Sequence, residues 1–235
     1  MNRMPLVRAL FFIAFVFFSL AAVGNSGAES AITCHCFTQR TYDPGDRFAA
    51  DGYLLATSFN SLLARSFAMP KREIVMLKMK QGVGQNDLLI GLEIAGAAGV
   101  DLRQLLELRR QGQTWAEIIA APGLAEKIKK DPMLEALGSS MSNAEAGARV
   151  ADRLIADFYT VPLEVIGMFR ESGLNEREIN LLFILAHGSG RGLRQIAAMY
   201  TREGKSWSEI ADSLGIEPAA AGRLILQYPA GQRLH

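Results

Sequence analysis

A block of roughly 70 residues occurs twice in this chain, at an offset of 91 to 92 residues. The clearest match sets Gly99 to Ile118 (GVDLRQLLELRRQGQTWAEI) beside Gly190 to Ile210 (GRGLRQIAAMYTREGKSWSEI), with a gap of one residue. This alignment pairs glycine with glycine and tryptophan with tryptophan, namely Gly112 with Gly204 and Trp115 with Trp207. Repeats of this length are typical of folds assembled from related units, so the sequence predicts two related modules.

Each block also divides in half. The segment from Val161 to Ile179 resembles the segment from Val100 to Ile118. Spacings of about 31 residues between similar segments support a unit of two helices and two turns. We therefore predict four half-units, arranged as two modules of repeated helix pairs.

Helices are predicted by the spacing of apolar residues and by the residues that punctuate it. Between residues 102 and 108 the leucines recur at helical intervals, with charged and polar residues between them. Asp101 stands where an N-cap belongs, and Gly112 stands where the helix should end. Thr114 and Ser206 precede the two Trp-x-Glu-Ile segments and offer hydroxyl caps. Because no period-two alternation is sustained, we predict an all-α fold without a sheet.

The predicted organisation follows from these blocks and from the composition between them. A connector rich in proline, glycine and serine separates the blocks, and it should hold one short helix, Leu124 to Lys130, that ends at Asp131-Pro132. In chain order we predict a signal peptide (1–28), an irregular cysteine-containing arm (29–47), helical module 1 (48–120), the connector (121–147), helical module 2 (148–228) and a tail (229–235).

The first thirty residues have the three-part layout of a secretory signal peptide. Two arginines form a positive start, residues 9–23 form a run of fifteen residues that is apolar except for Ser19, and small and polar residues follow. We expect cleavage after Ala28, with Gly24 and Ser30 as alternative sites. A membrane-spanning helix needs about 20 apolar residues, so this run is short for an anchor, and an uncleaved anchor is the alternative. The mature protein should be periplasmic or secreted, with no further membrane span.

Composition and motifs narrow the classes of partner and activity. Removal of residues 1–28 changes the formal net charge from +1 to −1, so the mature chain is nearly neutral, which argues against nucleic acid or an anionic membrane surface as a partner. No carboxylate pair, Ser/His/Asp set or glycine-rich phosphate loop can be placed, so we expect no enzyme. Grooves between repeated helix pairs instead predict a protein or peptide partner, or self-association. The leading hypothesis is an exported, non-enzymatic scaffold or protein-binding module.

The two cysteines stand together as Cys34-His35-Cys36, the one cluster of soft metal ligands in the sequence. Two thiolates and an imidazole can hold Zn²⁺ or Cu⁺. In an oxidising compartment Cys34 and Cys36 could instead close a local disulfide, or react with another protein. Cys34, His35 and Cys36 therefore carry a second hypothesis, a periplasmic metal-binding or thiol-redox-linked protein, beside the simpler one of a local disulfide without a further role.

Residues 204–226 combine Ile210-Ala211, a tight turn at Leu214-Gly215-Ile216 and a second helix from Pro218. This pattern resembles the helix–turn–helix of bacterial DNA-binding regulators. The resemblance implies a helical turn geometry over about twenty residues. It also implies a third hypothesis, a DNA-binding protein whose N-terminal segment is a membrane anchor.

The second helix of this segment is poor in groups that contact DNA. A recognition helix needs donors for phosphates and base edges. Residues 217–227 offer Arg223 and Gln227 among alanines, and the first block departs further because Ala120-Ala121-Pro122-Gly123 interrupts the same place. We therefore expect the geometry of the motif and do not expect nucleic acid as the partner.

Trp115 and Trp207 are the most conspicuous repeated residues. Burial of an indole ring contributes several kilocalories per mole, so we predict that each packs a short helix onto its neighbour. Stacking on a ligand is the alternative. Gly112 and Gly204 complete the set of repeat positions that we predict to be structural, because glycine suits the end of a helix.

Overall fold

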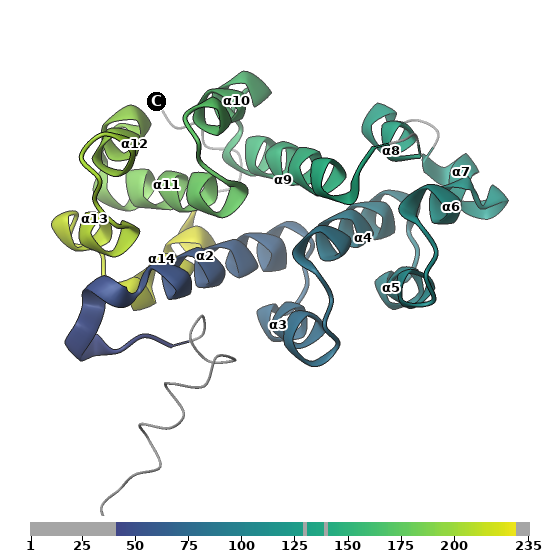
Figure 1. Ribbon diagram of the computed structural model, residues 1–235, viewed down its shortest axis with the longest axis horizontal. Coiled ribbons are helices and arrows are strands. Elements are labelled where there is room, and N and C mark those ends of the chain that lie inside the picture. The colour runs from purple at the N-terminus through teal and green to yellow at the C-terminus, as the bar shows by residue number, and fades with distance from the viewer. Residues whose placement is uncertain (1–40, 129–130, 139–140, 229–235) are drawn as a thin grey trace, which may run out of the picture.

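The computed structural model describes residues 41–128, 131–138 and 141–228, and in these ranges every regular element is a helix (Figure 1). The prediction of an all-α fold is confirmed. The first half contains the 3₁₀-helix η1 (Pro44–Ala49) and the α-helices α2 (Asp51–Ser66), α3 (Lys71–Lys80), α4 (Gln85–Ala98), α5 (Leu102–Arg110) and α6 (Trp115–Ala120). The connector contains α7 (Pro122–Ile128) and α8 (Pro132–Leu137). The second half contains α9 (Asn143–Tyr159), α10 (Leu163–Glu171), α11 (Glu176–Ser189), α12 (Leu193–Thr201), α13 (Trp207–Ser213) and α14 (Pro218–Gln227).

Several helices begin where the sequence supplies a cap. The Asp101 side chain accepts a hydrogen bond from a first-turn backbone N–H of α5 (2.7 Å), which confirms its predicted role. Thr114 and Ser206 begin α6 and α13 with capping boxes, in which the hydroxyl accepts from a backbone N–H three residues on and the glutamate there accepts from the cap. Asp43 caps η1 and so gives the end of the predicted irregular arm (29–47) a helical turn.

In its described residues the connector holds two short helices before α9, so the prediction of a single helix from Leu124 to Lys130 is wrong. α7 begins earlier, at Pro122, because the N–H that proline lacks has no partner in the first turn of a helix. Asp131 and Pro132 begin α8 rather than ending α7. The Asp131 carboxylate accepts from the backbone N–H of Met133 (3.0 Å), and Pro132 occupies the first turn.

The long first helix of each half packs against the other half. α2 lies against α11 and α14, whereas α9, at the corresponding place in the second half, lies against α4. Figure 1 shows two layers, with α2 and α4 following one another in one layer and α9 and α11 in the other. The helices packed around α4 and the helices packed around α11 therefore each come from both halves of the sequence.

The core runs between these two layers. Helices α2, α4, α9 and α11 bury apolar side chains along it, among them Leu54, Phe59, Leu62, Leu88, Ile90, Val150, Ile155, Leu181 and Phe183. Gly147 lets α9 approach α4 closely, because a Cβ on this residue would lie 2.5 Å from the Asn86 Oδ1. Within the described ranges, no helix is both long and apolar enough to cross a membrane.

Left-handed backbone occurs at corresponding turns of the two halves. Gly112 (φ 94°) and Gly204 (φ 69°) follow α5 and α12, where a residue with a Cβ would be strained. Ala68 (φ 48°) and Thr160 (φ 55°) follow α2 and α9, although neither is glycine. In both cases a proline stands two residues later, just before the next helix. The two halves thus turn at the same places.

Candidate functional site

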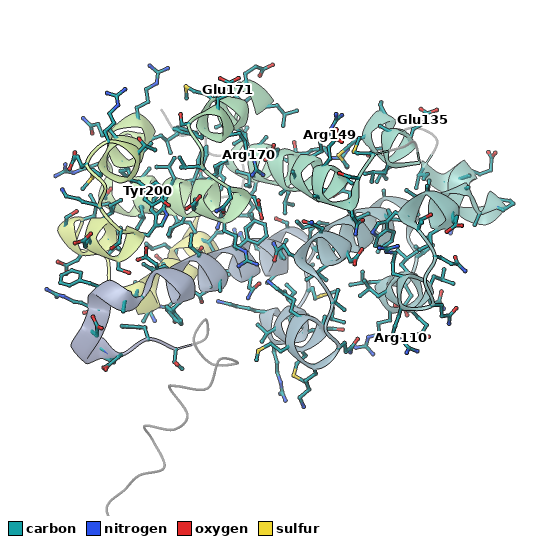
Figure 2. The ribbon with its side chains drawn as sticks, viewed as in Figure 1. Arg110, Glu135, Arg149, Arg170, Glu171 and Tyr200 are labelled. Carbon is teal, nitrogen blue, oxygen red and sulfur yellow. The ribbon has the colours of Figure 1, made fainter. Side chains whose placement is uncertain are left out.

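A tryptophan, a carboxylate and a stacked ring form one buried cluster in the second half. Trp207, at the start of α13, is 1% exposed, and its Nε1 donates to the Glu178 Oε1 on α11 (3.4 Å). The Tyr200 hydroxyl donates to the same oxygen (2.7 Å), and its ring stacks on the indole with centroids 4.6 Å apart. Figure 2 shows Tyr200 on α12 pointing toward α11. These contacts join α11, α12 and α13.

The first half holds a cluster of the same arrangement with different side chains. Trp115 Nε1 donates to the Asp87 Oδ1 on α4 (2.9 Å). Arg109 takes the place of the tyrosine: its Nε donates to the Asp87 Oδ1 (3.0 Å), and its guanidinium carbon lies 5.3 Å from the centre of the indole ring. Both tryptophans are therefore hydrogen-bonded and stacked within the fold.

The helices that pack against the opposite half, α2 and α9, each contribute their first residue to one of these clusters. At the start of α9, the Asn143 Nδ2 donates to the Asp87 Oδ1 (2.9 Å). At the start of α2, the Asp51 carboxylate accepts from the backbone N–H groups of Trp207 (3.1 Å) and Ser208 (2.7 Å). The clusters therefore fix the points at which α2 and α9 meet the opposite half.

Hydrogen bonds keep the Asp87 carboxylate ionised. Burial by itself raises the pKa of this group, but donors on Asn143, Trp115 and Arg109 outweigh burial and leave the pKa below its ordinary value. A carboxyl group whose pKa is lower in the folded state stabilises that state at a pH above its ordinary pKa. Asp87 should therefore contribute to stability at neutral pH and lose that contribution in acid.

Replacement of Asp87 by asparagine should lower the free energy of unfolding by about 1–3 kcal/mol at pH 7, because charge-assisted hydrogen bonds become neutral or are lost. Urea denaturation measures the difference from the wild type. That difference should shrink as the pH falls below about 4, the ordinary pKa of an aspartate, because Asp87 gains its proton first in the unfolded wild type and only at lower pH in the folded one. An unchanged difference at pH 3 would contradict this role of the charge.

A second polar network joins α9 to the first half. Arg153 Nη1 donates to both oxygens of Asp131 (2.9 Å each), and Nη2 donates to the Glu93 Oε1 on α4. Burial raises the pKa of Glu93, and the charge of Arg153 offsets this in part. Burial also opposes ionisation of Asp131, but hydrogen bonds from Arg153 and from the backbone of Leu134 hold its pKa below the ordinary value. One arginine thus neutralises two half-buried carboxylates.

The predicted metal or redox residues, Cys34, His35 and Cys36, lie outside the described residues. Within residues 41–128, 131–138 and 141–228, no three His, Cys, Asp or Glu side chains are grouped as they would be around a metal ion. The possible Zn²⁺ or Cu⁺ site therefore stays a prediction from the sequence.

The segment that resembles a helix–turn–helix forms α13 and α14, joined by a turn with Gly215 at φ 70°. α14 packs against α2, and its Gly222 permits this because a Cβ there would lie 3.2 Å from the Ser61 Oγ. Arg223 and Gln227 are exposed on α14. DNA binding by this segment stays the third hypothesis from the sequence, which does not predict nucleic acid as the partner.

A groove of about 390 Å³ adjoins the Trp115 cluster, between the turn at residues 81–84 and α5. Three arginines line it, and each pairs with an acidic side chain: Arg103 with Glu73 (2.7 Å), Arg109 with Asp87 (3.0 Å) and Arg110 with Glu107 (2.6 Å). Figure 2 shows Arg110 at the edge of the molecule. Because its charges are already paired, this groove offers little to an anionic ligand.

A groove of about 590 Å³ lies where the end of α9, the start of α10 and the start of α12 meet. Its lining is mainly apolar and comprises Ala156, Asp157, Thr160, Val161, Pro162, Val165 and Leu193. Leu163, the next residue after Pro162, is 53% exposed. The Asp157 side chain is exposed and forms no hydrogen bond or ion pair with another described residue. The apolar run Val161-Pro162-Leu163 is the sequence signal for this groove, but a run of three residues alone does not distinguish a surface from a core.

Comparisons of this chain with protein families, with characterised proteins and with solved structures find no match.

Proposed function

We propose that this protein is an exported, non-enzymatic helical scaffold that binds a protein partner in the groove between α9, α10 and α12. The observation that carries the proposal is an exposed, mainly apolar groove lined by one carboxylate, Asp157, whose side chain forms no hydrogen bond or ion pair with another described residue. The occupant is a segment of the partner that carries an apolar side chain next to a lysine or arginine.

The corresponding corner of the first half supports a polypeptide as the occupant. Arg65, at the end of α2, corresponds in sequence to Asp157 at the end of α9. Its guanidinium donates to the backbone carbonyls of Leu226 (2.7 Å) and Tyr228 (3.0 Å), so a segment of the chain itself passes along that corner. At α9 the charge is reversed, and a carboxylate selects a cationic side chain from a partner.

A structural rather than catalytic role for the interior polar groups also supports the proposal. The two tryptophan clusters and the Arg153 network join helices that are distant in sequence. The recurrence of these clusters, and of the left-handed turns, agrees with the origin of the two halves in an internal duplication. Export rests on the sequence of residues 1–28.

The test is site-specific photocrosslinking of the full chain, expressed with its own leader in its native host. A photoreactive phenylalanine at Val165 should crosslink to a partner segment with an apolar residue beside a lysine or arginine, whereas the same group at Glu145, exposed near the start of α9, should not. Asp157→Lys should abolish the crosslink, and a lysine-to-glutamate change in the partner should restore it. Mass spectrometry of the product should also show the loss of residues 1–28.

Two outcomes would contradict the proposal. A crosslink of equal yield in the wild type and in Asp157→Lys would show that the charge of Asp157 does not contribute to recognition of the partner. Equal crosslinking at Val165 and Glu145 would mean that the groove captures proteins without selection.

A further inference from the structure

Lys78, on α3, lies among groups that offer it few acceptors. Its Nζ donates to the Asn60 Oδ1 on α2 (3.1 Å) and to the Gln85 Oε1 at the start of α4 (2.8 Å). The Gln85 Oε1 also accepts from the Arg177 Nη2 on α11 (3.1 Å), so two cations share one neutral oxygen. The Gln85 Nε2 is buried and has no hydrogen-bond partner among the described residues. Its orientation is fixed, because the two cations require the oxygen on their side.

The second half has the same arrangement with two carboxylates. Arg170 Nε and Nη2 donate to the Asp152 Oδ1 (2.9 and 2.7 Å), and Nη1 donates to the Glu176 Oε2 (3.2 Å). Figure 2 shows Arg170 on α10. The residues at the corresponding positions of the first half are, in the same order, Lys78, Asn60 and Gln85. The first half therefore keeps the cation and replaces both carboxylates by amides.

The Lys78 site is consequently short of negative charge. Burial, followed by the charge of Arg177, lowers the pKa of Lys78 to about 8, although the charge of Glu176 opposes both. Glu176 is bound by Arg170 and forms no ion pair with Lys78. Helices α4 and α11 begin at Gln85 and Glu176, so the positive ends of two helices also meet here.

We propose that Lys78 and Arg177, held together by the Gln85 Oε1, form a binding site for the carboxylate group of an organic acid. One carboxylate supplies the negative charge that Asp152 and Glu176 give to Arg170 and that the amide oxygens of Asn60 and Gln85 do not give to Lys78. A single negative charge suits the site better than a dianion, because Glu176 repels further charge. The site is separate from the groove at α9, α10 and α12 and goes beyond the function proposed there.

The test compares thermal unfolding of the mature chain at pH 7 in sodium acetate and in sodium chloride of equal ionic strength. Acetate at ten times its dissociation constant should raise the Tm by about 3 °C relative to chloride. Lys78→Met should lose this shift, whereas Lys80→Met, which changes an exposed lysine on the same helix, should keep it. The Asp157→Lys variant should also keep it, which separates this site from the partner groove.

A second variant tests the proposed carboxylate site even if Lys78→Met does not fold. The double substitution Asn60→Asp and Gln85→Glu supplies both carboxylates from within the chain, so its Tm in chloride should rise and its response to acetate should disappear. Equal Tm values of the wild type in acetate and chloride, or an acetate response that survives the double substitution, would overturn the proposal. A short peptide with a free C-terminus, compared with its amide, distinguishes the two sources of the carboxylate: preference for the free peptide over acetate assigns a polypeptide end, and the reverse assigns a free acid.

Discussion

Replacement of Trp207 by alanine should lower the free energy of unfolding by about 3–5 kcal/mol, as is usual when a fully buried aromatic side chain is truncated. The ring fills space between α11, α12 and α13 and covers the Tyr200 ring. Its loss also leaves the Glu178 carboxylate, which is 7% exposed, with one donor fewer. Urea denaturation of the mature chain, followed by circular dichroism at 222 nm, measures the change.

Two conservative variants separate packing from hydrogen bonding at this cluster. Trp207→Phe keeps an aromatic ring but removes the N–H, so it should cost less than the alanine variant. Tyr200→Phe keeps the stacked ring and removes one hydrogen bond to Glu178, which should cost about 1–2 kcal/mol. If the free energy of unfolding of Trp207→Ala were within 1 kcal/mol of the wild-type value, the cluster would not hold the three helices together.

Replacement of Arg153 by methionine should lower the free energy of unfolding by about 2–4 kcal/mol at pH 7. The variant retains most of the volume and the apolar stem but leaves Glu93 and Asp131 without their cation. The Glu93 and Asp131 side chains are 16% and 26% exposed, so neither is fully hydrated. Arg149→Met is the matched control, since its ion pair with Glu145 lies on the exposed part of the same helix and should contribute little.

The effect of Arg153→Met should depend on pH in a defined direction. Burial already raises the pKa of Glu93, and removal of the arginine should raise it further. The folded variant then binds a proton more readily than the unfolded chain, so its stability should increase as the pH falls from 7 toward 4. The difference from the wild type should therefore be largest at neutral pH. Denaturation at pH 7 and pH 4.5 tests this, and a difference that grew in acid would contradict it.

The helices and many of their ends could be predicted from the sequence, because the signals that set them are local. Asp101, Thr114 and Ser206 cap helices through backbone groups two or three residues away. The place of Asp131-Pro132 could not be predicted for the same reason, because this pair can follow one helix or begin another. The contact of Asp131 with Arg153, 22 residues on, is not part of the local pattern.

The packing of α2 and α9 against the opposite halves could not be predicted. The sequence pattern of the repeat would be the same whether the first helix of each half packed within its own half or against the other half. The contacts that decide it are distant in sequence. Asn143 bonds to Asp87, and Asp51 bonds to the start of α13, 156 residues away. Local periodicity carries no information on such pairs.

The tryptophans were conspicuous in the sequence, but their partners were not. Asp87 and Glu178 stand at corresponding positions near the starts of α4 and α11, yet they differ in length, and their stacking neighbours differ in kind. The proposed site at Lys78 could not be predicted for a related reason. The first half has the amides Asn60 and Gln85 where the second half has the acids Asp152 and Glu176. This difference is visible only after the two halves are superposed residue by residue.

The exchange of first helices also bears on what a shorter polypeptide would have to do. A chain with only the second half would contain α9 without the α4 surface that covers it, and α11 and α14 without α2. Two identical copies could satisfy each other by trading that helix about a twofold axis, which is the closed geometry of most homodimers. Joining two such copies end to end would turn an association that depends on concentration into an intramolecular one, and each copy would then be free to diverge.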